Sequence, residues 1–524
     1  MIKSFPLDTT LHTGHADDMP TITIAAETSR DAPLRMTADD FRQSGHALVD
    51  SIATFLESLA ERPVTPSESP GAVQAVLDAD RPFPEHGTEA GALLAHTSRL
   101  LFDHGLFNGH PRFFGYITAS PAPIGMLGDL LAAAVNPNVG AWRLAPVATE
   151  IEAQTVRWIA DFIGFPAPSG GIMVSGGNMA NITGFLAARA AAAPWDVRAE
   201  GTSAGGASRL RVYASAETHT WIQKAADITG LGTDSIRWIG TDDDQRMDTG
   251  ALREAIAQDR SRGDVPMIVV GTAGSVSTGA IDPLAEIAGI CREAGIWFHV
   301  DGAYGGLAAS VPGVSPDLRA LSLADSVAVD PHKWMYAPLE AGCTIVRDPE
   351  TLRAAFAYHP PYYHFGHEAT NFADLGPQNS RGFRALKVWL AMQQVGRAAY
   401  VRMIGDDIRL SERMHAAVSE HPELEACTQS LSISTFRYVP RALRARSGEP
   451  DVGLYLNTLN EALLERIQQS GELFVSNAVI RGRYLLRACI VNFNTTAADV
   501  DALPAIVARL GHDVDRGLRP PALV

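Results

Sequence analysis

Several features are scarce or absent in this 524-residue chain, and each absence argues against a class of protein. Cysteine occurs only four times and never with CxxC spacing, so no disulfide framework is predicted. No uninterrupted apolar run reaches the roughly 18 residues that a membrane-spanning helix needs, and the N-terminus has no charged-then-apolar signal pattern. The formal net charge of −16 argues against nucleic acid or an anionic membrane as a partner. These absences predict a cytoplasmic protein.

The chain is too long for one simple core, and its composition, 46% hydrophobic and 19% charged, is ordinary for a globular enzyme subunit. We predict four parts: a flexible extension (1–35), an N-terminal helical arm and dimerisation segment (36–125), a large domain (126–404) and a small α+β domain (405–524). The arm begins with an amphipathic helix near Thr37, which a Pro-rich stretch separates from the main body. Its apolar face therefore needs a partner subunit to cover it.

Predicted strands and helices alternate over residues 170–330, which favours a largely parallel sheet. Ligands of such sheets bind beyond the carboxyl ends of the strands. Several polar residues follow predicted strands at this edge, namely the turn at 175–178, His219, Thr272, Asp301 and Lys333. Their common position predicts one shared site. Elsewhere the spacing of apolar residues predicts helices at 146–162, 221–228, 406–420 and 457–470, and strands near 431–438, 473–479 and 484–492.

Asp301 and Lys333 are the most informative pair. Asp301 ends an apolar strand in His-Val-Asp-Gly-Ala-Tyr-Gly, and Lys333 follows a second strand in Asp-Pro-His-Lys-Trp. A lysine can bind the aldehyde carbon of pyridoxal phosphate (PLP), and a carboxylate can pair with the pyridinium nitrogen so that the ring accepts electrons. Either residue alone is typical of a turn or a solvated surface. The pair indicates a PLP site.

A glycine-rich turn is the second feature of this edge. The segment Ser175-Gly176-Gly177-Asn178 links a short apolar strand to an Ala-rich helix. Glycines let backbone amides approach an anion, and the helix N-terminus adds the positive end of its dipole. No Gly-Lys-Ser/Thr follows, so the turn is not a P-loop. It predicts a phosphate cradle, with a plain strand-to-helix connection as the alternative.

Residues 351–382 are poorly periodic and rich in His, Tyr, Pro and Asn, which predicts a mobile lid. His359, His364 and His367 lie there. Their spacing matches no standard metal site, so no metal is predicted.

These motifs resemble the PLP-dependent group II amino-acid decarboxylases, which include the aromatic L-amino acid and glutamate decarboxylases. The resemblance runs from about residue 37 to about 515, and it also includes Arg-Gly-Phe-Arg-Ala-Leu-Lys after the lid. It implies an α/β protein of PLP fold type I, the aspartate-aminotransferase-like fold, with a mixed, mostly parallel sheet. It also implies a homodimer with active sites at the interface, and decarboxylation of an amino acid as the reaction.

The resemblance further assigns roles to individual residues. Lys333 is expected to form a Schiff base with PLP, Asp301 to partner the pyridinium nitrogen and His219 to stack on the ring. Ala303 is expected on the other ring face and His332 beside the lysine. The remaining expected contacts are Gly176, Gly177 and Asn178 with the phosphate, Ser380 with the phosphate of the other subunit, Thr118 and Thr272 near the cofactor, and Arg487 near the substrate carboxylate. For Arg487, a charge at a strand edge is an equally good explanation.

Phe372 departs from the family pattern. Counted back from residues 382–384, it holds the lid position where family decarboxylases carry a proton-donating tyrosine. In this family a phenylalanine there is associated with aldehyde synthases, in which O2 intercepts the reaction and aldehyde, ammonia and peroxide are released. Tyr358, Tyr362 or Tyr363 could replace the donor if the lid is threaded differently. We therefore expect release of the amine, with aldehyde synthesis as the alternative.

The expected substrate pocket also departs from the pattern, because Gly140 stands where relatives carry a phenylalanine. Tyr116 and Trp142 favour an aromatic or bulky apolar substrate, whereas Arg143 leaves an acidic one open. A non-catalytic scaffold with the same fold is a third possibility. The intact lysine, aspartate and histidine set argues against it.

Overall fold

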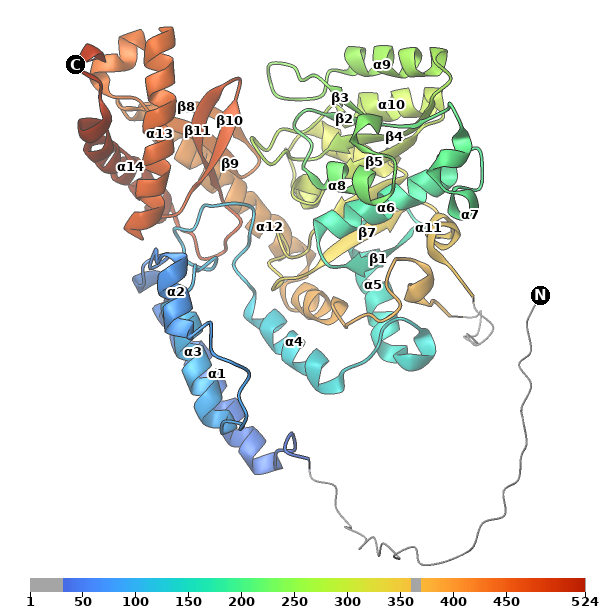
Figure 1. The fold of residues 1–524 in the computed structure, drawn as a ribbon, viewed down its shortest axis with the longest axis horizontal. Helices are drawn as coiled ribbons and strands as arrows, with labels where there is room; N and C mark the ends of the chain where they lie inside the picture. The colour runs from blue at the N-terminus through green and yellow to red at the C-terminus, as the bar shows by residue number, and fades with distance from the viewer. Residues whose placement is uncertain (1–31, 360–368, 524) are drawn as a thin grey trace, which may run out of the picture.

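The fold is described from a computed structural model, which places residues 32–359 and 369–523. Two β-sheets organise these residues (Figure 1). The larger has seven strands in the order β1-β7-β6-β5-β4-β2-β3. Their bounds are β1 (Gly170–Val174), β2 (Leu210–Ser215), β3 (Ile236–Ile239), β4 (Val265–Thr272), β5 (Trp297–Asp301), β6 (Ser326–Val329) and β7 (Gly342–Val346).

The central strands pair in parallel, whereas β7 runs antiparallel to both β6 and β1. Strands β2, β6 and β7 are buried along their whole length, because helices cover both faces of the sheet. The predicted α/β class with a mixed, mostly parallel sheet is confirmed.

Helices form a layer on each face. One core cluster joins the sheet to α5 (Pro146–Phe162), α9 (Thr249–Ser261), α10 (Leu284–Ala294) and the first half of α12 (Ala385–Glu420). A second joins the opposite face to α6 (Gly177–Ala192) and α8 (Trp221–Ile228). The short helices α7 (Val197–Glu200) and α11 (Pro349–Phe356) complete this region. Helices α5 and α8 have the predicted bounds.

The second sheet is antiparallel, in the order β10-β11-β9-β8, and packs with two long helices. Its elements are β8 (Leu424–Ser430), β9 (Ile433–Tyr438), α13 (Pro450–Ser470), β10 (Ser476–Ile480), β11 (Arg483–Cys489) and α14 (Ala497–Leu518). This small α+β unit was expected, but strand β8 and helix α14 were not. Helix α12 connects it to the large unit and is interrupted at Gly396, whose φ of 73° is not helical.

The N-terminal helices project from the main body as an arm (Figure 1). They are α1 (Ala38–Ser58), α2 (Pro70–Leu77) and α3 (Ala90–Asp103), followed by α4 (Pro123–Val135). Thr37 caps α1 as predicted, since its side chain accepts a hydrogen bond from the Asp40 amide. Stacked rings of Phe55 and Phe102, 4.4 Å apart, hold α1 on α3, yet α1 buries no residue in the single chain.

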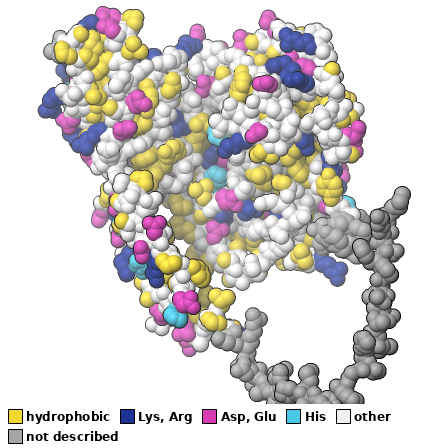
Figure 2. Space-filling view, viewed as in Figure 1, with side chains coloured by type: hydrophobic (Ala, Val, Ile, Leu, Met, Phe, Trp, Pro, Cys, Tyr) yellow, Lys and Arg dark blue, Asp and Glu magenta, His cyan; other side chains and the backbone are white. Residues whose placement is uncertain are grey.

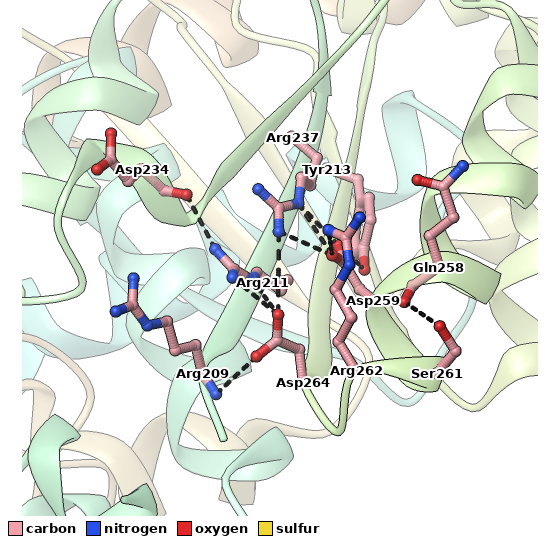
Figure 3. A network of polar contacts seen from close by, with 10 residues as sticks. All are labelled: Arg209, Arg211, Tyr213, Asp234, Arg237, Gln258, Asp259, Ser261, Arg262 and Asp264. Atoms are coloured by element: carbon pink, nitrogen blue, oxygen red, sulfur yellow. Dashed lines mark hydrogen bonds and ion pairs between the residues drawn. The ribbon is translucent and has the colours of Figure 1, made fainter. Parts of the chain in front are cut away.

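Buried charges stabilise the edge of the large sheet opposite the strand carboxyl ends (Figure 3). Asp259 accepts hydrogen bonds from the Tyr213 hydroxyl (2.9 Å) and from Arg237, and Asp264 pairs with Arg211 (2.7 Å). These contacts join α9 to strands β2 and β3 without touching the site described below.

The segment expected as one irregular lid, 351–382, is more structured at both ends. Its first residues belong to helix α11, and residues 371–381 lie against the loop at 138–142. His364 and His367 fall outside the described residues, as do Tyr362 and Tyr363. None of the helices placed in the structure is long and apolar enough to span a membrane.

Candidate active site

The loops that follow strands β2, β4, β5 and β6 enclose a cavity at the carboxyl edge of the large sheet. Parallel strands end at the same edge, so residues far apart in sequence meet there. The cavity is lined by Ile117, Gly177, Asn178, Asn181, His219, Thr272, Gly274, Val276, Asp301, Ala303, Tyr304, Asp330 and Lys333.

Asp301 is the last residue of β5 and is 8% exposed. Its Oδ2 atom accepts a hydrogen bond from the Trp221 indole nitrogen (2.8 Å), and its Oδ1 atom accepts one from the Ala303 amide (3.1 Å). Hydrogen bonds to both oxygens stabilise a charged carboxylate and fix its direction. Such a group can pair with a cationic ring nitrogen.

A buried histidine supports this carboxylate from within the sheet. The His299 ring lies edge-on to Trp221, with 5.8 Å between centroids. Its Nδ1 atom is 2.7 Å from Ser326 Oγ, and its Nε2 atom is 2.8 Å from Asn181 Oδ1. Burial lowers the pKa of His299 to about 4, so the ring is neutral near pH 7.

His219 lies between strand β2 and helix α8. Its Nδ1 atom accepts a hydrogen bond from the Trp221 amide (3.3 Å), so the proton of the neutral ring is on Nε2. His219 is exposed in the single chain, but the atoms packed around its ring lower its pKa by desolvation, against the opposing charge of Asp301. A neutral imidazole at the cavity can stack on a planar ligand.

Lys333 follows strand β6, and its side chain is 18% exposed. Its Nζ atom forms an ion pair with Asp330 Oδ2 at 3.0 Å. His332 Nε2 is 3.6 Å from the same oxygen, and its Nδ1 atom accepts from the Ala341 amide (3.2 Å). Burial lowers the pKa of His332, so the lysine is the cation that balances Asp330.

The turn from β1 into α6 needs its two glycines. Gly176 has a φ of 106°, which few other residues adopt. A Cβ atom on Gly177 would lie 2.5 Å from Asp330 Oδ2 and 3.0 Å from the Ala303 Cβ atom. The first turn of the 16-residue helix α6 therefore packs directly against the lysine loop, with Asn178 exposed at its start.

Two buried oxygens at the cavity have no hydrogen-bond partner among the described residues, Thr272 Oγ1 and Asp330 Oδ1. Buried polar atoms rarely remain unpaired, so both are available to a polar ligand. The site thus offers an amine, a hydrogen-bonded carboxylate, an imidazole face and a glycine turn at a helix N-terminus. These four groups suit the aldehyde, ring nitrogen, ring face and phosphate of PLP.

Several expected site residues lie apart from this cavity. They are on the loop at 138–142 and on the segment 371–381 that lies against this loop. The Gly140 carbonyl accepts a hydrogen bond from the Ala373 amide (2.8 Å), and the Trp142 amide donates one to Asn371 (3.1 Å). Trp142 is 37% exposed, and Ser380 is also exposed.

Phe372 also lies apart from the cavity, in an apolar cluster with Ile172 and Leu375. It is 1% exposed, and the Arg381 guanidinium lies 4.9 Å from its ring centroid. Arg381 in turn donates hydrogen bonds to Glu152 and to the Val139 carbonyl. The ring and the guanidinium together fix the end of the expected lid.

Arg487 lies in strand β11 behind the aromatic loop. It is 2% exposed, and its Nη1 atom donates to the Tyr116 carbonyl (3.2 Å) and to Ser476 Oγ (3.0 Å). Its Nε and Nη2 atoms have no partner among the described residues. Tyr116 is 55% exposed and Thr118 is half-buried, whereas Ile117 between them lines the cavity.

Most of the expected cofactor residues therefore meet in one place, and the expected substrate residues do not line the cavity of the single chain. The sequence interpretation missed Asp330, although it directly follows strand β6, three residues before the lysine. It also missed Asn181 and Tyr304. No group of three metal-ligating side chains occurs within residues 32–359 and 369–523.

Known proteins resemble this chain over most of its length. The family model described as the pyridoxal-dependent decarboxylase conserved domain matches residues 70–439. An aromatic-L-amino-acid decarboxylase of Bacillus atrophaeus is 30% identical over 486 residues, covering 92% of this chain and 97% of that protein. A phenylacetaldehyde synthase of a Rosa hybrid cultivar is 28% identical over 466 residues, covering 86% and 90%. The crystal structure of Oryza sativa TDC with PLP and tryptamine matches with a TM-score of 0.84 at 28% identity, covering 92% and 99%.

Proposed function

Because the chain belongs to the pyridoxal-dependent decarboxylase family and is a PLP-dependent carboxy-lyase of fold type I, we propose that it decarboxylates an aromatic or bulky apolar L-amino acid to the amine. One observation carries the assignment of the site: Lys333, Asp301 and His219 come from three different strand-end loops and line the same cavity. Either of the first two residues alone would have an ordinary structural explanation.

Bound PLP supplies an electron sink for the electron pair that remains at the substrate Cα when CO2 leaves. Asp301 would hold the proton on the ring nitrogen, because its two oxygens are already fixed by Trp221 and Ala303. His219 would cover one ring face and exclude water from it. The amides at 176–178 and the α6 N-terminus would hold the phosphate.

Lys333 would hold PLP through its amine, at the aldehyde carbon. Asp330 Oδ2, 3.0 Å from its Nζ atom, would stabilise the ammonium form whenever the lysine is free. This ion pair would keep the Lys333 amine at the cavity, where PLP would bind.

The substrate class is inferred from aromatic groups and from the relatives. The ring of Tyr116 lies 5.9 Å from that of Phe474, and the Trp142 ring is partly exposed with its nitrogen bound to Glu150 (3.0 Å). Similar proteins act on aromatic amino acids by name, including a tyrosine decarboxylase from rice that is 31% identical. Exposed aromatic rings suit an aromatic side chain better than an acidic one.

The chain offers a clean test of the proposed lysine. It contains only four lysines, at positions 3, 224, 333 and 387. Borohydride reduction of the PLP-loaded protein, followed by peptide mass spectrometry, should place the pyridoxyl group on Lys333. Lys387 is the matched control, because it is likewise paired with a carboxylate, Asp129 (3.1 Å), and is 5% exposed. A label on any other lysine would refute the assignment.

The reaction itself is tested with a panel of amino acids, measuring CO2, amine, aldehyde and peroxide together. Aromatic substrates should release CO2 and amine in equal amounts, and Lys333→Ala should release neither. Preference for glutamate or aspartate would refute the proposed substrate class.

Aldehyde synthesis is the second candidate, favoured by Phe372 and by the similarity to a phenylacetaldehyde synthase. If Phe372 stands in the donor position, protonation at Cα lacks its acid, which typically contributes about 10²–10⁴-fold. Phe372→Tyr should then shift the product from aldehyde and peroxide to amine. If the ring serves only as packing beside Arg381, the change adds a hydroxyl to an apolar cluster and alters stability but not the product ratio. Equal amine yields with and without O2 would show that Phe372 serves only as packing.

We also propose that the active protein is a homodimer. Helix α4 leaves Leu127, Leu130, Leu131 and Val135 more than half exposed, and helix α1 buries no residue. Figure 2 shows hydrophobic side chains in the hollow between the arm and the main body. An apolar surface of this extent needs a partner, and a second copy would cover both helices.

A further inference from the structure

The backbone turn that carries Lys333 is held in place by the residues that follow the lysine. Its backbone closes with a hydrogen bond from the Tyr336 amide to the Lys333 carbonyl (3.0 Å). Tyr336 has a φ of 53°, a conformation that bulky residues rarely adopt. Trp334 and Tyr336 are both fully buried, with exposures of 0% and 1%. A strained, buried residue persists only where its surroundings hold it in place.

Asp407, in the second half of helix α12, holds Trp334 and Tyr336 in place. A single oxygen, Oδ2, accepts hydrogen bonds from the Trp334 indole nitrogen (2.9 Å) and from the Tyr336 hydroxyl (2.8 Å). Asp407 is 3% exposed. Burial raises the pKa of its carboxyl to about 7, against the hydrogen bonds from Tyr336, Trp334 and the Asn492 amide, which lower it. A buried carboxyl is tolerated only where its oxygens have such partners.

Other contacts extend this connection to both sides. Tyr400, about two helical turns before Asp407 on α12, donates a hydrogen bond to the Met335 carbonyl (3.2 Å). The Trp334 ring stacks on Tyr304, 4.6 Å between centroids, and Tyr304 lies three residues after Asp301. The Tyr304 hydroxyl accepts a hydrogen bond from the Ser432 amide of the small unit (2.9 Å). The lysine turn is therefore fixed to the helix that joins the two units.

We propose that Asp407 is a positioning residue that sets the direction in which the Lys333 turn presents its side chain to PLP. The inference rests on the proposed role of Lys333 as the PLP-binding lysine. Asp407 acts through Trp334 and Tyr336 and touches no reacting atom. Loss of either hydrogen bond would let the strained turn relax while the rest of the cavity stays in place.

A matched pair of variants separates positioning from plain stability. Tyr336→Phe and Tyr213→Phe each remove one hydroxyl from a buried ring, and each hydroxyl binds a buried aspartate, Asp407 or Asp259 (2.8 and 2.9 Å). Tyr213 belongs to the network of Figure 3, at the opposite edge of the sheet. Both variants should therefore lose similar stability. Only the first should disturb the cofactor.

The experiment uses PLP-loaded protein and three readouts: the rate of PLP release, the visible circular dichroism of bound PLP, and kcat and KM for the best substrate of the panel. Tyr336→Phe should release PLP about 10-fold faster, the effect of one lost hydrogen bond to a buried carboxyl. Its kcat should fall while KM changes little, because misplacement of a reacting group weakens transition-state contacts. Asp407→Leu should show larger changes in the same direction, and Tyr213→Phe should match the wild type.

Borohydride labelling of each variant keeps the two hypotheses apart. If the wild type is not labelled at Lys333, the proposed function fails. If Lys333 is labelled and Tyr336→Phe matches Tyr213→Phe in all three readouts, the positioning role of Asp407 is wrong. Because Tyr336→Phe keeps the ring and its packing, that comparison stands even if Asp407→Leu does not fold.

Discussion

A single methyl group added at Gly140 is expected to detach the segment that crosses it. A Cβ atom at this position would lie 2.1 Å from the backbone oxygen of Asn379, and a backbone atom cannot rotate away. The same loop binds the crossing segment through the Gly140 carbonyl and the Ala373 amide (2.8 Å), and through the Val139 amide and the Arg381 carbonyl (2.9 Å). Gly140→Ala must therefore push the loop at 138–142 and the segment 371–381 apart.

The cost follows from these contacts. Overpacking of a filled site costs about 1–3 kcal/mol. Loss of one of the two backbone hydrogen bonds adds roughly 1 kcal/mol. The free energy that holds residues 371–381 on the loop should fall by about 2–4 kcal/mol. Since about 1.4 kcal/mol is a factor of ten at 25 °C, amide exchange limited by local opening should accelerate by roughly 30- to 1000-fold.

Hydrogen exchange with mass spectrometry on peptides covering 371–381 measures this opening directly. Gly289→Ala is the control, because a Cβ atom there meets nothing within 4 Å and the residue lies inside helix α10. That control should stabilise its helix slightly, by up to about 1 kcal/mol, and leave the exchange of 371–381 unchanged. Unchanged exchange in Gly140→Ala would refute the steric argument.

Three further predictions concern the site and the assembly. Asp301→Asn should keep bound PLP but slow CO2 release at least 100-fold, roughly the effect of one lost charge contact, as measured with the best substrate. Burial lowers the pKa of His299 from 6.5 to about 4, so its contribution to stability is present above pH 6.5 and lost as pH falls through 4. The free energy of unfolding, measured with denaturant, should therefore fall by about 3 kcal/mol over this pH range. His299→Gln should lack this pH dependence. Deletion of residues 1–60 should lower solubility and PLP retention, and a monomeric, fully active product in sedimentation would contradict the dimer.

The parts of the fold that sequence predicted well are those governed by local pattern. Helices α5 and α8 have the predicted bounds because each has an apolar stripe, and α5 also begins with a proline. The strand-end argument brought Asp301, Thr272 and Lys333 to one edge because parallel topology alone dictates that meeting. These steps needed no knowledge of side-chain contacts.

The parts that sequence missed depend on contacts between distant segments. Strand β7 is short and apolar, and only its antiparallel pairing with β1 and β6 makes it a strand. Residues 371–381 are ordered by hydrogen bonds to a loop more than 200 residues earlier in the chain. The local sequence, which contains Asn and Gly, cannot show these bonds and therefore predicts only an irregular lid. Asp330 could have been predicted from sequence, because it directly follows a strand, one place beyond the position that Asp301 holds in β5. Its ion pair with Lys333 could not be read from spacing alone.

The expected site residues of one chain fall into two groups, those that line the cavity and those that lie apart from it. Most of the residues expected to hold the cofactor line one cavity, at the carboxyl ends of strands within a single chain. Trp142, expected to contact the substrate, and Ser380, expected to contact the phosphate of the other subunit, are exposed elsewhere on the same chain. We therefore propose that Trp142 and Ser380 reach an active site only across the interface of the proposed homodimer, so that substrate turnover and full PLP retention both depend on assembly.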